Sequence, residues 1–165
     1  MGQGIATSYL QIFSEQLQIP VNQLKVVQGD TDLVEGHGSV GSRSLFVGGN
    51  AILRGIEDFL EECKQLAASE LEASVEDLEY HQGNFQVKGT RVGIGIFDLC
   101  SRQSDNSISV KRKKELTGRS WPNGCHVAEV EIDAETGEVR LDRYVSVDDV
   151  GNTVNPMIVH GQVQG

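Results

Sequence analysis

A glycine-rich loop from Gln28 to Ser44 is the stretch of this sequence best suited to binding a ligand. It reads Gln-Gly-Asp-Thr-Asp-Leu-Val-Glu-Gly-His-Gly-Ser-Val-Gly-Ser-Arg-Ser. Glycines let a backbone approach a ligand closely and adopt positive φ angles, while serine hydroxyls, an arginine and free backbone N–H groups can hold an anion. The loop therefore predicts contact with a phosphorylated cofactor. The alternative is a solvated surface loop, which is commonly rich in Gly and Ser.

Two further segments place a glutamine beside glycine. They are Gly2-Gln3-Gly4 near the amino end and Gly161-Gln162 near the carboxyl end. A glutamine amide both donates and accepts hydrogen bonds, and the start of a following helix offers unpaired N–H groups to a phosphate. Together with the central loop, these segments predict a large polar cofactor that carries a phosphate tail.

The segment from Gly36 to Gly41 also matches Gly-x-Gly-x-x-Gly, a signature of dinucleotide-binding folds. Such a fold needs the glycines directly between a strand and a helix, within a βαβ unit. Here about seven residues separate the expected strand from Gly36, and the next helix is expected only from about Gly49. The spacing therefore disfavours a nicotinamide dinucleotide as the ligand.

Other residue types that support catalysis do not converge in the sequence. The pair Asp30 and Asp32 lies far along the chain from Asp148-Asp149, so these carboxylates define no set of oxygen ligands for a divalent cation. Gly-x-Ser-x-Gly is absent. Neither the histidines nor the cysteines have metal-ligand spacing; they are His37, His81, His126, His160, Cys63, Cys100 and Cys125. We therefore expect no metal ligands and no catalytic residues within this stretch.

The charge balance is strongly acidic. Among 165 residues, 14 Lys and Arg against 24 Asp and Glu give a net charge of −10 at pH 7, which disfavours nucleic acid or an anionic membrane as a partner. The basic run Lys111 to Lys114 is isolated in this background and is interpreted as a solvated loop. No apolar run approaches the roughly 20 residues of a membrane span, and no secretion signal is recognisable. We expect a cytoplasmic location.

The apolar pattern predicts an α+β fold. Helical spacing from Ile5 to Leu17, and again from about Gly49 to Leu71, predicts two amphipathic helices. Shorter elements are expected as a strand over 24–28, a hairpin pairing 78–81 with 85–88, and helices over 94–100 and from Pro156. These elements predict a mixed sheet with a long hairpin in the C-terminal half and two amphipathic helices packed on it.

The longest hairpin is expected between residues 125–133 and 139–147. Apolar and polar residues alternate in both stretches, and Ala134 to Gly137 supplies a turn that ends in glycine. The alternation places His126, Ala128, Val130 and Ile132 on one face of the first strand, and the pattern resumes with Val139, Leu141, Val145 and Val147.

The two ends of the sequence lack the lead-in and the final cap of a complete domain. The last expected helix begins at Pro156 and reaches Gly165 without a clear cap, which leaves little apolar face to bury. We therefore expect residues 1–165 to be a partial domain of a longer polypeptide.

Four ordered motifs resemble the molybdopterin-binding large subunit of the molybdenum hydroxylases, the family of carbon monoxide dehydrogenase, aldehyde oxidase and xanthine dehydrogenase. The resemblance spans nearly the whole chain, and Gly-Ser-Arg-Ser looks closer to the bacterial carbon monoxide dehydrogenase-like large chains than to animal xanthine dehydrogenases. The motifs are Met-Gly-Gln-Gly at 1–4, Val-Gln-Gly-Asp-Thr-Asp at 27–32, Gly-Ser-Arg-Ser at 41–44, and Val-Asp-Asp-Val-Gly-Asn at 147–152, followed by Asn155-Pro156-Met157 and Gly161-Gln162.

The resemblance implies a cofactor, a reaction and partners. The cofactor is molybdopterin, whose forms in this family include the cytosine dinucleotide, and the reaction oxidises the carbon centre of a small molecule (an aldehyde, a purine or other N-heterocycle, or carbon monoxide) with water as the oxygen source. Electrons then pass to iron–sulfur and flavin subunits or domains of the same enzyme. The residues implied to lie against the cofactor are Gln3, Gly4, Val40, Gly41, Ser42, Arg43 and Gln162.

Two parts of the family pattern lie outside this sequence. The general-base glutamate of the family follows the Gly-Gln motif at a position beyond Gly165, and a glycine-rich segment near the metal precedes Met1. A binding site needs its complete set of convergent groups, so we expect the isolated chain to be inactive and to hold no cofactor stably. The alternative is a non-catalytic remnant or interaction module that retains the fold.

Overall fold

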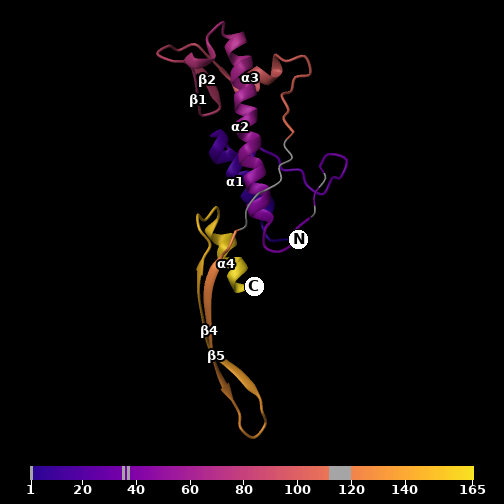
Figure 1. Ribbon diagram of the computed structural model, residues 1–165, viewed down its shortest axis with the longest axis vertical. Helices are drawn as coiled ribbons and strands as arrows, with labels where there is room; N and C mark the ends of the chain where they lie inside the picture. Colours follow the sequence, from indigo (N-terminus) through magenta and orange to yellow (C-terminus); the bar gives the residue numbers. More distant parts are fainter. Residues whose placement is uncertain (1, 35, 37, 112–119) are drawn as a thin grey trace. The chain divides into compact units, whose positions relative to one another are not determined.

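The computed structural model describes residues 2–34, 36, 38–111 and 120–165, and the chain forms two compact units (Figure 1). One unit comprises residues 2–117 and the other residues 118–165. His37 and most of the basic run, residues 112–114, lie outside the described residues. The two units are described separately below.

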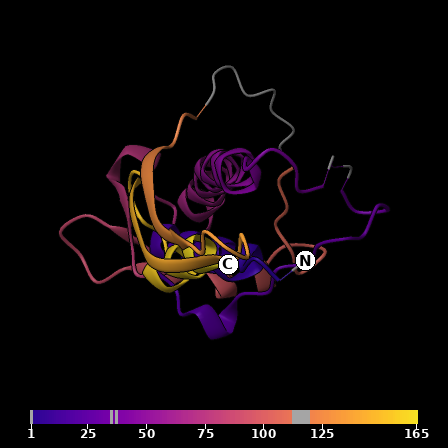
Figure 2. The ribbon, with the colours of Figure 1, turned by 90° about the horizontal axis from the view of Figure 1, so that it is seen from below.

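Two helices form the axis of the larger unit. Helix α1 spans Ile5–Leu17 and ends where Gln18 turns into the left-handed region at φ 50°. Helix α2 spans Ser44–Glu70 and is seen end on in Figure 2. Both predicted helices are confirmed, although α2 begins before Gly49, the expected start.

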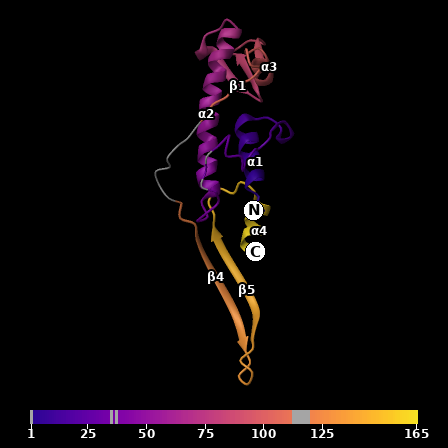
Figure 3. The same ribbon diagram turned by 90° about the vertical axis from the view of Figure 1, so that its right-hand side faces the viewer.

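A three-stranded antiparallel sheet packs against the C-terminal half of α2 (Figure 3). The predicted hairpin is confirmed, because positive φ at Gln82 (47°) and Gly83 (77°) gives the tight turn that antiparallel strands need. The order is β1-β2-β3. The elements of this region are the 3-10 turns Val21–Gln23 and Val75–Asp77, β1 (Leu78–His81), β2 (Asn84–Val87), β3 (Gly93–Gly95) and α3 (Ile96–Ser101).

Two neighbouring apolar clusters hold this unit together. The larger one packs the sheet and α3 against α2, and Cys63, Phe85 and Leu99 at its centre are at most 1% exposed. Burial raises the pKa of the Cys63 thiol to about 12, so this thiol stays protonated. The smaller cluster joins α1 to α2 through Leu17 and Ile56. Apolar burial of this kind is the main stabilising term of the unit.

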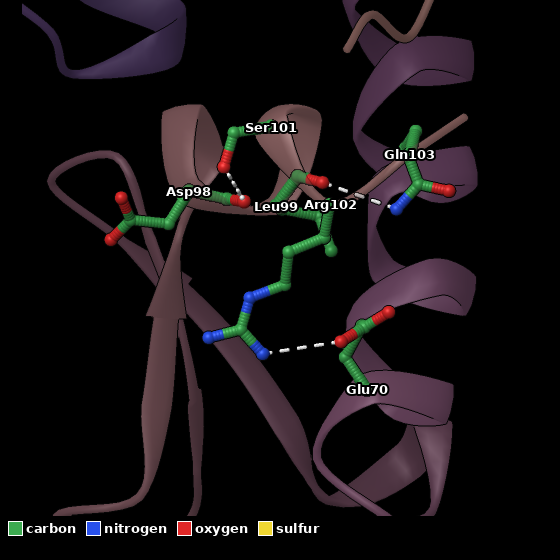
Figure 4. A network of polar contacts seen from close by, with 6 residues as sticks. All are labelled: Glu70, Asp98, Leu99, Ser101, Arg102 and Gln103. Atoms are coloured by element: carbon green, nitrogen blue, oxygen red, sulfur yellow. Dashed lines mark hydrogen bonds and ion pairs between the residues drawn. The ribbon is translucent and has the colours of Figure 1, made fainter. Parts of the chain in front are cut away.

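Polar contacts fix the end of α3 beside α2, as Figure 4 shows. Arg102 reaches across to Glu70 of α2 at 3.2 Å, Gln103 donates to the carbonyl of Leu99, and Ser101 donates to the carbonyl of Asp98. The ion pair is half exposed, which limits its contribution to less than about 1 kcal/mol. Its role is to orient α3 rather than to hold it.

The smaller unit contains a long antiparallel hairpin and one helix. Strand β4 (Asn123–Ile132) pairs with β5 (Val139–Asp149), which confirms the predicted hairpin, and α4 (Pro156–Gln164) starts at the expected proline. Asn155 caps α4 by accepting a hydrogen bond from the Ile158 N–H. The turn is closed by Asp133, which accepts the N–H groups of Thr136 and Glu135 at 2.8 Å each. These hydrogen bonds hold the pKa of Asp133 below its usual value.

A β-bulge changes which residues of β5 share a face. Glu129 pairs with Arg143 but the next residue, Val130, pairs with Leu141, so Asp142 has no partner across the hairpin. Val139 and Leu141 therefore lie on the same face as Val130. The alternation in the sequence predicts that Val145 and Val147 share this face. The bulge moves Val145 and Val147 to the opposite face.

The α+β fold is confirmed, and two details differ from the expectation. The described strands form two separate antiparallel sheets instead of a mixed sheet, and α2 and α3 pack on the three-stranded one. The strand predicted over 24–28 is wrong, because this segment is irregular and has no strand beside it to accept its backbone hydrogen bonds.

Shortening the buried Leu99 tests the larger cluster. We expect Leu99→Ala to lower the free energy of unfolding by about 2–5 kcal/mol, because it leaves a cavity at a fully buried site. Phe97→Ala, on the same helix but at a side chain 54% exposed, is the matched control and should cost less than about 1 kcal/mol. Urea denaturation followed by circular dichroism measures both; equal losses would contradict this placement of the core.

Candidate functional site

The starts of α1 and α2 lie at the same end of the larger unit. The Tyr9 hydroxyl donates to the carbonyl of Ser44 at 2.9 Å, and Ile12 lies 3.5 Å from the position of a Cβ on Gly49. Leu17 packs in one cluster with Ile56. Contacts thus advance together along both helices, which are therefore parallel and side by side (Figure 1). Both positive ends of the helix dipoles point to one region.

Neither helix start has a side-chain cap or an acidic residue within its own first turn. The residue preceding each helix, Gly4 for α1 and Arg43 for α2, makes no side-chain capping bond, and neither first turn holds an acidic residue. The first N–H groups of an α-helix have no partner within the helix. This end of the unit can therefore donate several hydrogen bonds to an anion.

A hydrogen bond joins the two predicted ligand-binding segments of this unit. The Gln3 amide donates to the Ser39 hydroxyl at 2.9 Å, and Ser39 is in turn hydrogen-bonded to the Ser44 hydroxyl at the start of α2. Gly41 and Ser42 turn the loop with φ of 60° and 51°. The positive φ at Ser42 is uncommon for a residue other than glycine and marks a backbone held by its surroundings.

The predicted cofactor contacts divide between the two units. Gln3, Gly4 and the loop residues lie together at the paired helix starts, and the loop side chains from Val40 to Arg43 are exposed. Gln162 lies on α4 of the smaller unit and is exposed as well. The structure therefore brings the amino-terminal and central segments together.

Tyr9 is a residue of this site that the motifs did not reveal. Besides its bond to Ser44, its ring fits over Gly48, where an added Cβ would lie 1.9 Å from the hydroxyl oxygen. Burial raises the pKa of Tyr9, which keeps the hydroxyl protonated as a donor. A tyrosine one α1 turn beyond a Gly-Gln-Gly segment, with a Gly-Gly pair on the following helix, is the sequence signal for this close packing.

The smaller unit holds a polar cluster of its own. His126 bonds through Nδ1 to the Tyr144 hydroxyl at 2.6 Å and through Nε2 to Asp148 at 3.0 Å. A cavity of about 530 Å³ beside it is lined by β5 and α4; its residues are Tyr144, Ser146, His160, Val163 and Gln164. The cluster ties β4 to β5 across the end of the hairpin near α4.

The described residues contain neither a metal-ligand cluster nor a helix suited to crossing a membrane. Within them, no group of three or more His, Cys, Asp or Glu side chains is arranged to hold a metal ion. No helix in the same part of the chain is long and apolar enough to cross a membrane.

Comparison with known proteins identifies the family. The family model described as molybdopterin cofactor-binding domain matches residues 1–165. This chain belongs to that family. It corresponds to one part of the molybdopterin-binding large subunit of the molybdenum hydroxylases, as the four motifs predicted.

Comparisons with individual relatives support this family membership. It is 31% identical to the 6-hydroxypseudooxynicotine dehydrogenase complex subunit gamma of Paenarthrobacter nicotinovorans over 100% of its length, and to the carbon monoxide dehydrogenase large chain of Hydrogenophaga pseudoflava over 99%. It spans 22% of either protein. The structure of carbon monoxide dehydrogenase from Oligotropha carboxidovorans superimposes with a TM-score of 0.81 at 29% identity, over 98% of this chain and 21% of that one.

Replacing Gly48 tests the close packing of α1 on α2. We expect Gly48→Ala to displace the Tyr9 ring, break its bond to Ser44 and lower the free energy of unfolding by about 1–3 kcal/mol. Gly55→Ala is the matched control on the same helix; nothing lies within 4 Å of its added Cβ, so it should stabilise by up to about 1 kcal/mol. Urea denaturation measures both variants, and equal effects would contradict the close approach at Gly48.

Proposed function

We propose that this chain contributes the phosphate-binding part of a molybdopterin site to a molybdenum hydroxylase large subunit. The observation that carries the proposal is the Gln3–Ser39–Ser44 chain of hydrogen bonds, which lies where two uncapped helix starts point. Molybdopterin carries a phosphate and a ring system rich in hydrogen-bonding groups, which fits amide, hydroxyl and N–H partners of this kind.

The residues present fit such a cofactor. The Gln3 amide, the Ser42 hydroxyl and the Arg43 guanidinium can bond polar groups and a phosphate, while Gly4 and Gly41 allow the backbone to come close. Gln162 would supply a further amide from the smaller unit, and Val40 an apolar contact. The dinucleotide form of the cofactor would carry a second phosphate, which needs a further cationic or N–H partner. The exposed Arg43 is suited to be such a partner.

The activity belongs to the large subunit that contains such a segment. When bound, the molybdenum centre supplies a two-electron oxidation of a carbon centre with water as the oxygen source. The residues of this chain hold and orient the cofactor, and none of them is assigned to proton transfer. We infer that electrons leave through iron–sulfur and flavin partners, as the resemblance to the molybdenum hydroxylases implies. The chain spans 22% of the two relatives named above, and we infer that residues 1–165 are a partial domain that holds part of the site.

Replacing Gln3 tests the cofactor role. The test protein is a chimera in which residues 1–165 replace the matching segment of the Hydrogenophaga pseudoflava large chain. We expect Gln3→Ala to lower its molybdenum content at least about tenfold, because a buried cofactor group loses its amide partner. Molybdenum is measured by mass spectrometry, and circular dichroism confirms that the fold is retained.

The control for this experiment is Gln65→Ala on the exposed surface of α2, where the side chain only bonds Glu61 within the helix. This variant should keep its molybdenum. If Gln3→Ala and Gln162→Ala both keep full molybdenum content, the chain is a non-catalytic remnant or interaction module that merely retains the fold.

Isolation of the chain tests whether the segment acts alone. Expressed by itself, the 165-residue chain should fold but hold no stoichiometric molybdenum, and it should oxidise neither an aldehyde nor a purine, because the remaining groups of the site are missing. Metal analysis and a dye-reduction assay measure the two properties. Turnover by the isolated chain would contradict the proposal.

A further inference from the structure

The β4–β5 hairpin exposes large apolar side chains along most of its length. Eight of them are 49% to 71% exposed: Val127, Val130, Ile132, Val139, Leu141, Tyr144, Val145 and Val147. A two-stranded hairpin is marginally stable by itself in water, and apolar surface on this scale marks an interaction site. The hairpin therefore needs a surface that covers it.

The exposed apolar residues form two sectors on opposite faces, separated by the bulge at Asp142. The tip sector consists of Val130, Ile132, Val139 and Leu141, near the turn; the base sector consists of Val127, Val145 and Val147, near the other end of the hairpin. The ion pairs Glu129–Arg143 and Glu131–Arg140 occupy the tip half of the face that holds the base sector. On the other face, α4 and the His126 cluster occupy the base half.

This arrangement defines the shape of the covering surface. A partner on one side would reach only one sector, so covering both sectors requires protein on both faces of the hairpin. The described sheet contains β4 and β5 alone, so each strand also keeps one edge whose backbone groups are unpaired within it. Such an edge can accept a further strand. The hairpin is thus shaped for insertion between two layers, with a strand added at its side.

Charge distinguishes among the available partners. Residues 123–149 hold eight carboxylates against two arginines, and the other residues of the chain are also acidic in balance, with sixteen acidic against twelve basic side chains. A second copy, or the larger unit of the same chain, would therefore bring like charge to the hairpin. A basic, strand-containing surface is the better match.

We propose that the hairpin inserts into the part of the large subunit that this chain does not contain. The chain spans only 22% of its relatives, so most of a large subunit is available as this partner. That part covers both apolar sectors, adds a strand at one edge and presents Lys or Arg to the carboxylates. The inference rests on the family and on the hairpin itself and does not require cofactor binding.

Hydrogen–deuterium exchange tests the insertion by comparing the isolated chain with the chimera described above. We expect the amides of β4 and β5 to exchange at least about 100-fold more slowly in the chimera, because the hairpin is then covered and paired. Equal rates would overturn the proposal, as would a chimera that stays insoluble while the unmodified relative is soluble. Slow exchange of these amides in the isolated chain would show that the chain itself, as a monomer or as a dimer detected by light scattering, covers the hairpin. That result would also overturn the proposal.

Substitutions in the two sectors give a second readout. Val130→Asp and Val147→Asp should each lower the yield of soluble chimera at least about fivefold, since each buries a charge in the assembled subunit. Neither should change the urea midpoint or elution volume of the isolated chain, where both side chains are exposed. Ala134→Asp, in the exposed turn, is the matched control and should leave both proteins unchanged.

If both sector variants leave the yield of soluble chimera unchanged, the sectors stay in solvent and the proposal is wrong. A folded chimera that has a protected hairpin but lacks molybdenum would refute the cofactor role and leave the insertion intact. A chimera that holds molybdenum but has an exposed hairpin would refute the insertion and leave the cofactor role intact.

Discussion

The packing of α1 alongside α2 is the constraint on which the candidate site depends. Because the helices are parallel, both of their positive ends lie in the same region, and the loop between them must return to the start of α1. The contact of Tyr9 with Gly48 and with the Ser44 carbonyl fixes this alignment at the end where the ligand-binding segments meet. A pair of antiparallel helices would place one positive and one negative end there and would not favour an anion.

The buried core contacts and the proposed cofactor contacts lie at opposite ends of α2. Its C-terminal half packs into the larger apolar cluster through Cys63 and Ala67, which are fully buried. Its N-terminal end carries the polar contacts and exposed loop side chains. The buried half anchors the helix, so the exposed end can remain polar and uncapped without loss of the fold. Sites supported by a rigid element in this way keep their geometry when the ligand is bound.

Local sequence patterns predicted which helices and hairpins form better than they predicted where an element begins or which strand it pairs with. The helices and both hairpins follow from apolar spacing and turn residues, but a strand over 24–28 was expected where no neighbouring strand exists, and strand formation depends on that neighbour. The apolar spacing predicts the start of α2 at about Gly49, whereas the helix already includes Gly48, which makes room for Tyr9. The ordered motifs identified the family, but they contain neither Tyr9 nor Gly48, whose packing aligns the segments that meet at Gln3 and Ser39.

The unpaired Asp142 has a consequence for how this protein can vary. One residue without a cross-strand partner reverses the orientation of every side chain that follows it in β5, as a shift of one residue does in any strand. Without this residue the remaining cross-strand pairs would follow one another in regular alternation, so Val145 and Val147 would keep the face opposite Leu141. A single-residue deletion among the paired residues of β5 would instead turn the side chains that follow it to the other face, so it would change the surface as thoroughly as several simultaneous substitutions.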